Sequence, residues 1–142
     1  MKDAKTLAYI NLFAVLGALP YLCDLDRKSA QIIENDNISV GFAVKGGPSA
    51  TLFFGGGRCR MVPGADRCQV KLPFPSCGKF NGLIDGTVTP IPVRGITKAG
   101  FLLGPFKKLT DRLTAFLRPA PGALDDPEFF RISTTLMFHV IT

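Results

Sequence analysis

The order of apolar and polar residues divides the chain into a helical first third, a central group of strands and a helical last part. Apolar residues at helical spacing near the N-terminus predict an amphipathic packing helix with Asp3 as its N-cap. Pro20 is expected to break or kink this helix, and Asp26 to cap a second short helix that runs through Ile33. The stripe expected to face the core consists of Leu7, Ile10, Phe13, Ala14 and Leu16.

From residue 38 onward the apolar period becomes two, which predicts a half-buried strand over 38–45. Glycine-rich turns lead from it into strands over 50–54 and 58–62, and the run 68–72 adds a fourth to this antiparallel meander. A short helix capped by Ser76 and ended by Gly86 follows. Val88, Ile91 and Val93 predict a fifth strand at a sheet edge, because the prolines between them cannot donate ladder hydrogen bonds.

Two further helices are predicted in the last third. The first runs from about residue 98 to 117, with Pro105 distorting its first turns, and the second opens at Asp126. The second helix is apolar nearly all round, so it needs burial on several sides, and a second copy of the chain is one source. No glycine or basic last turn ends it before Thr142, so we expect the natural chain to continue. The inward stripe of the first helix is Leu102, Phe106, Leu109, Leu113 and Phe116.

The composition shows more apolar residues than a core of this size requires. With 142 residues the chain is expected to form a single domain, 1–142, in which 123–142 is a helical extension. Hydrophobic residues make up 46% and Phe alone counts 12, more than a lean core requires, so part of the excess is expected to line a cavity. The net charge of +6 is compatible with an anionic membrane surface or with a solvated basic surface that binds nothing.

Candidate catalytic and metal-binding residues are few. The four cysteines form no CxxC pair, so we expect no metal site, and buried structural thiols of this kind are typical of a reducing, cytoplasmic protein. His139 is the one histidine and has no orienting partner in the pattern, so we expect no catalytic residue, no cofactor and no enzymatic activity.

Targeting and nucleic-acid signals are also weak. The apolar run 7–22 is interrupted by Asn11, Gly17 and Pro20, which favours a packing helix over a signal peptide or membrane anchor. The triple glycine at 55–57 lacks the Lys-Ser/Thr of a phosphate-binding loop. Basic residues form no compact run with interleaved aromatics, so no nucleic-acid partner is expected.

Four segments together resemble the sterol carrier protein domain family: ISVGFAVK at 38–45, ATLFFGGG at 50–57, KFNGLIDG at 79–86 and PIPVRGITKAGFLLGPFKKL at 90–109. The resemblance implies an α+β fold with a mixed, mainly antiparallel five-stranded sheet covered by helices. It also implies a tunnel for a fatty acyl chain, acyl-CoA or a sterol-like lipid. The chain departs from the family at Thr87, where a lysine is usual, and in the helix beyond Asp126.

The predicted site is the apolar space between the sheet and the helices. Lys98, Lys107, Lys108 and Arg112 are expected to attract an anionic head group or an anionic membrane. The alternative is a solidly packed interaction or regulatory domain that forms a homodimer through its C-terminal helix. The predicted ligand-binding residues are Phe42, Phe54, Phe80, Leu83, Ile84, Phe101, Leu102, Phe106 and Leu109.

Overall fold

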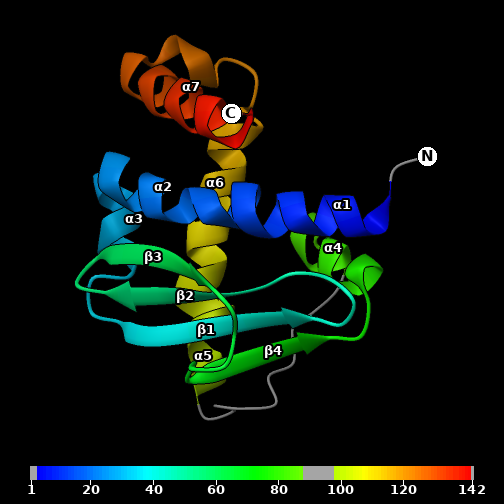
Figure 1. The fold of residues 1–142 in the computed structure, drawn as a ribbon. Helices are drawn as coiled ribbons and strands as arrows, with labels where there is room; N and C mark the ends of the chain where they lie inside the picture. Colours follow the sequence, from blue (N-terminus) through cyan, green and yellow to red (C-terminus); the bar gives the residue numbers. More distant parts are fainter. Residues whose placement is uncertain (1–2, 88–97, 142) are drawn as a thin grey trace.

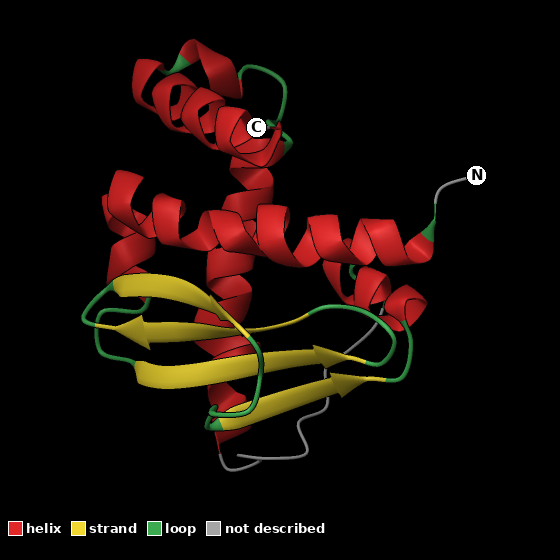
Figure 2. Ribbon diagram, in the orientation of Figure 1, coloured by secondary structure: helices red, strands yellow, loops and turns green. Residues whose placement is uncertain are grey.

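The computed structural model describes residues 3–87 and 98–141, and these form an α+β fold in which helices pack on a sheet (Figures 1 and 2). Figure 1 shows α5 and α6 running crosswise behind the sheet, while α1 and α2 run along its β3 side. The elements are α1 (Ala4–Tyr9), η1 (Ile10–Val15), η2 (Leu16–Ala18), α2 (Leu19–Leu25), α3 (Arg27–Ile32), β1 (Asn37–Val44), β2 (Ser49–Gly55), β3 (Arg58–Pro63), β4 (Val70–Phe74), α4 (Cys77–Asp85), α5 (Ala99–Phe101), η4 (Leu102–Phe106), α6 (Lys107–Leu117), η5 (Ala123–Asp125) and α7 (Pro127–Ile141).

The sheet has the strand order β3-β2-β1-β4. The pairs β1–β2 and β2–β3 are antiparallel, as predicted, whereas β4 lies parallel to β1. The prediction that β4 continues an antiparallel meander is therefore wrong. Four strands are described where five were predicted, and the predicted strand through Val88, Ile91 and Val93 lies outside the described residues.

The segment between β3 and β4 is the reason for the parallel pairing. It crosses the sheet face that points away from the helices (Figure 1), and the backbone N–H of Gln69 donates to Ser39 Oγ at 2.8 Å. Gly41 makes this close crossing possible, because a Cβ atom there would lie 2.5 Å from Cys68 Sγ. The other face of β1 points to the helices and contributes Val40, Phe42 and Val44 to the core.

The N-terminal helix exposes most of the face that the sequence predicted to be buried. Of the predicted stripe, Leu7, Ile10 and Phe13 are exposed and Leu16 is buried, and Leu12, which the stripe did not include, is completely buried. Both faces of the helix are apolar, and its π-helical and 3-10 turns over 10–18 rotate the side chains away from a regular period, so spacing alone placed Leu7, Ile10 and Phe13 on the wrong side.

Capping in this region agrees in part with the prediction: Asp26 occupies the N-cap position of α3, but its side chain makes no capping hydrogen bond to the helix backbone. Asp3 caps α1, since its side chain accepts a hydrogen bond from the backbone N–H of Lys5 at 3.1 Å. Pro20 distorts the helix without ending it, because it lies in the first turn of α2, where its missing N–H costs little. Within the described residues, Ala4–Leu25 is long and apolar enough to span a membrane by length and composition. Core helices and signal sequences share these properties, and half of its most apolar window is buried inside the fold.

The helix predicted over 98–117 follows the prediction closely, whereas α7, which was expected to need burial on several sides, leaves Phe130 and Phe138 exposed. The inward stripe predicted for 98–117 is buried along its whole length, and Pro105 lies in the π-helical η4. Asp126 accepts a hydrogen bond from the backbone N–H of Glu128 at 3.1 Å, as expected of the cap of α7. On α7, Ile132, Ser133 and Leu136 are buried, and Ser133 Oγ donates to the backbone carbonyl of Phe116 on α6.

Candidate ligand-binding site

Six phenylalanine rings form a continuous cluster between the sheet and the helices. The centroids of Phe54 and Phe101 are 5.1 Å apart, and the ring of Phe106 lies 6.2 Å from those of Phe42 and Phe54. Phe42 also contacts Phe80 edge-on at 6.2 Å. Such offset and edge-on pairs are favourable beyond the apolar area they bury. The six are Phe42, Phe54 and Phe74 from the sheet, Phe80 from α4, Phe101 from α5 and Phe106 from η4.

The predicted site residues therefore occupy one region of the fold. Seven of the nine are buried, while Leu83 and Ile84 are half-buried on α4 and pack against the same core. Sequence reasoning did not include Phe74, because the prolines beside it indicate the end of a strand. Pro73 instead belongs to β4, an edge strand of the sheet, where it pairs with Ala43 of β1. The strand continues to Phe74, whose ring contacts that of Phe80.

One wall of this region departs from regular helix geometry. The segment α5–η4 is a single helical turn followed by a π-helical turn that contains Gly104 and Pro105. Pro105 removes a backbone donor, and Gly104 lowers the cost of changing the backbone conformation. Leu102 is buried in this segment, but its neighbour Leu103 is 69% exposed. The wall thus combines a glycine and a proline in irregular helix with an apolar side chain in solvent.

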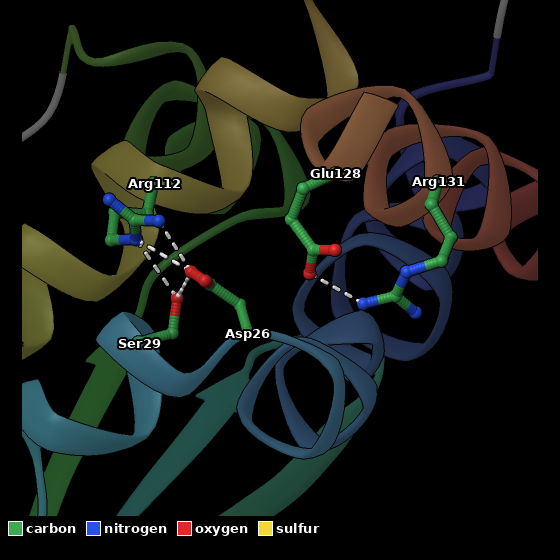
Figure 3. Close-up of polar contacts among 5 residues, drawn as sticks. All are labelled: Asp26, Ser29, Arg112, Glu128 and Arg131. Carbon is green, nitrogen blue, oxygen red and sulfur yellow. Dashed lines mark hydrogen bonds and ion pairs between the residues drawn. The ribbon is translucent and has the colours of Figure 1, made fainter. Parts of the chain in front are cut away.

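Arg112 does not belong to the basic surface that was predicted to attract an anionic head group. Its Nη2 lies 2.6 Å from Asp26 Oδ2, and its Nε donates to the same oxygen at 2.8 Å (Figure 3). Ser29 Oγ donates to Asp26 Oδ2 at 2.6 Å, which completes the cluster. Asp26 and Ser29 are buried, so this group joins the α2–α3 corner to α6. Lys98, Lys107 and Lys108 are exposed, as predicted.

Two of the buried cysteines, Cys23 and Cys59, have raised thiol pKa values. Burial raises the pKa of Cys23 to about 12, with smaller contributions from Asp24 and Asp26. Burial likewise raises the pKa of Cys59 far above its usual range. Because the thiolate is the reactive form, these two cysteines are poor nucleophiles at neutral pH. Among the described residues no group of three or more His, Cys, Asp or Glu side chains is placed to hold a metal ion.

Two open pockets lie at the surface on either side of β3, and neither was predicted. The first, of about 570 Å³, includes Ser39, Phe53, Arg58 and Arg60 in its lining. The second, of about 560 Å³, is lined in part by Phe13, Tyr21, Met61, Pro63 and His139. The alternation of Arg58 and Arg60 with apolar residues was a usable signal for the first pocket. Nothing in the sequence connects His139 with Tyr21 for the second.

Comparison with known proteins gives a distant likeness. The solution structure of the conserved hypothetical protein TT1886 from Thermus thermophilus matches this chain with a TM-score of 0.47 and 14% sequence identity. The match covers 84% of this chain and 85% of TT1886, which has been suggested to be a sterol carrier protein, the family that the sequence resembles. No family model and no curated protein matches the chain. The proposals below therefore rest on the chain's own residues.

Proposed function

We propose that the chain is a non-catalytic binding or transfer protein for an apolar ligand, which it holds between the sheet and the helices α4, α5 and η4. The aromatic cluster carries this proposal. It gathers six phenylalanine rings in one layer, and this layer is bounded by a wall of irregular helix rather than by a regular one. A ligand would part this wall from the sheet and replace ring–ring contacts by ring–hydrocarbon contacts.

The ligand class follows from the lining. Phenylalanine, leucine and isoleucine side chains offer no hydrogen bonds, so affinity must come from apolar area, at about 0.8 kcal/mol for each buried methylene. A fatty acyl chain, the acyl part of acyl-CoA or a sterol-like lipid meets this requirement. Of the exposed lysines, Lys98 precedes α5, and Lys107 and Lys108 begin α6. Lys107 pairs with Asp111 at 2.8 Å, so Lys98 and Lys108 are the ones best suited to an anionic head group or an anionic membrane surface.

A tryptophan placed in the wall tests the proposal, because the chain contains no Trp. In a Phe101→Trp variant, dibrominated stearic acid should quench the tryptophan fluorescence in a saturable titration, since bromine quenches at contact distance. Native mass spectrometry of the freshly purified natural chain should also show co-purified lipid. Phe106→Trp gives a second reporter if the first variant folds poorly.

The matched control places the tryptophan on α7 at Phe130, a side chain that is 50% exposed. Phe130→Trp should show no saturable quenching under the same conditions. Equal quenching at positions 101 and 130 would contradict the proposed function. So would a natural protein that is free of lipid together with Phe101→Trp and Phe106→Trp chains that show no quenching.

The alternative function, a solidly packed domain that forms a homodimer through α7, is favoured by a specific observation. Although α7 packs on α6, Phe130 and Phe138 remain 50% and 68% exposed. If a second copy covers them, a Phe130→Ser/Phe138→Ser variant should change from dimer to monomer in light scattering. Leu103→Ser, which alters an equally exposed apolar residue elsewhere, should leave the mass unchanged. A natural chain that is already monomeric would reject the dimer.

A further inference from the structure

The two surface pockets meet at the edge strand β3. Arg60 and Asp24 line both of them, so the hollows are neighbours around this strand rather than separate sites. Because side chains alternate along a strand, Arg58 and Arg60 lie on one side of β3 and Met61 on the other. No further strand pairs with β3 among the described residues. We call this continuous surface the β3 groove; it consists of Phe13, Tyr21, Arg58, Arg60, Met61 and His139.

One end of the β3 groove is basic. The Arg60 guanidinium lies 4.4 Å from the centroid of the Phe53 ring, a cation–π contact that limits its motion without using its hydrogen-bond donors. Arg58 and Arg60 are exposed, and no described carboxylate lies within ion-pair distance of either. Asp24 on the rim offsets part of this charge. Two guanidinium groups with free donors are suited to a carboxylate or a phosphate.

The other end of the β3 groove is apolar and contains an unpartnered polar atom. Phe13 and Tyr21 are exposed, and the His139 ring lies 4.0 Å from the Tyr21 ring. His139 Nε2 is buried and has no hydrogen-bond partner among the described residues.

We propose that the β3 groove binds an amphipathic anion. The hydrocarbon part lies on Phe13, Tyr21 and Met61, and the carboxylate or phosphate is bound by Arg58 and Arg60. This site is on the surface and shares no residue with the aromatic interior except Phe54, which borders its basic end. It therefore goes beyond the proposed function and does not depend on it.

The test compares three probes on the full chain by calorimetry, below the micelle concentration of the amphiphile. Dodecyl phosphate carries both chemical features, dodecanol lacks the anion, and inorganic phosphate lacks the chain. Since hydrogen bonds between charged groups exceed neutral ones, dodecyl phosphate should bind at least about tenfold more tightly than either. In a Tyr21→Trp chain it should also shift the tryptophan emission. Equal affinity for dodecyl phosphate and dodecanol, or for dodecyl phosphate and inorganic phosphate, would overturn the proposal.

A matched pair of double variants separates recognition from overall charge. The Arg58→Gln/Arg60→Gln variant should bind dodecyl phosphate about tenfold more weakly than the natural chain. The Lys79→Gln/Arg118→Gln variant removes the same charge from positions elsewhere on the surface, and its affinity for dodecyl phosphate should stay within about twofold of the natural value. Equal losses in both would show that only net charge matters. The Phe101→Trp chain reports on the interior independently. Quenching of Phe101→Trp by dibrominated stearic acid, without an emission shift of Tyr21→Trp by dodecyl phosphate, would contradict the groove proposal but not the interior site.

Discussion

Replacing Phe80 by alanine is expected to destabilise the chain by about 3–5 kcal/mol, the largest single-residue effect that we predict. The Phe80 side chain is completely buried, and its ring is edge-on to those of Phe42 at 6.2 Å and Phe74 at 5.2 Å. Truncation removes the apolar contacts, leaves a cavity between α4 and the sheet, and removes both aromatic pairs. Urea unfolding followed by circular dichroism measures the loss as a lower midpoint at unchanged slope.

Phe138→Ala is the matched control, because the same truncation at a side chain that is 68% exposed should cost no more than about 0.5 kcal/mol. The Phe80 result also bears on the function. A loss below about 1 kcal/mol would mean that this ring is not tightly packed on its neighbours, contrary to the structure. If the interior accepts hydrocarbon, stearic acid should restore part of the stability lost in Phe80→Ala, because it can fill the new cavity.

The strands could be predicted because their signals are local. The alternation over 38–45 and the glycine turns fix β1, β2 and β3 without reference to the rest of the chain. The parallel pairing of β4 could not be predicted in the same way. It depends on the path of 64–69 across the sheet, and this path depends on the contact of Cys68 with Gly41, which is 27 residues earlier by numbering (68 − 41).

The site was predicted in part for a similar reason. The helix formed by η4 and α6 is amphipathic, so the spacing of its apolar residues identifies Phe106 and Leu109 directly as buried. The N-terminal helix is apolar on two faces, and tertiary packing decided between them by burying Leu12 instead of Phe13. Phe13 thereby became part of the β3 groove, whose other residues come from α2, β3 and α7. A surface built from distant segments leaves no spacing for sequence reasoning to detect.

Arg112→Met is expected to destabilise the chain by about 2–3 kcal/mol. Removing one partner of a buried ion pair leaves an uncompensated charge, which costs about 3–5 kcal/mol in a fully buried pair. Here Asp26 is 9% exposed but Arg112 is 33% exposed, so water reduces the penalty. The loss should fall on the α2–α3 corner, because Asp26 and Ser29 are both held by the Arg112 guanidinium. Urea unfolding measures the total, and hydrogen exchange in α3 measures the local effect.

A double-mutant cycle distinguishes the ion pair from the packing of the arginine side chain. In Asp26→Asn/Arg112→Met no buried charge remains, so stability should recover relative to Arg112→Met alone. The second pair in Figure 3, Arg131 with Glu128, provides the exposed control: its atoms are 2.6 Å apart, but both side chains are more than half exposed. Arg131→Met should therefore change stability little. If both single variants had the same effect, the Asp26–Arg112 pair would not be what joins the helical corner to α6.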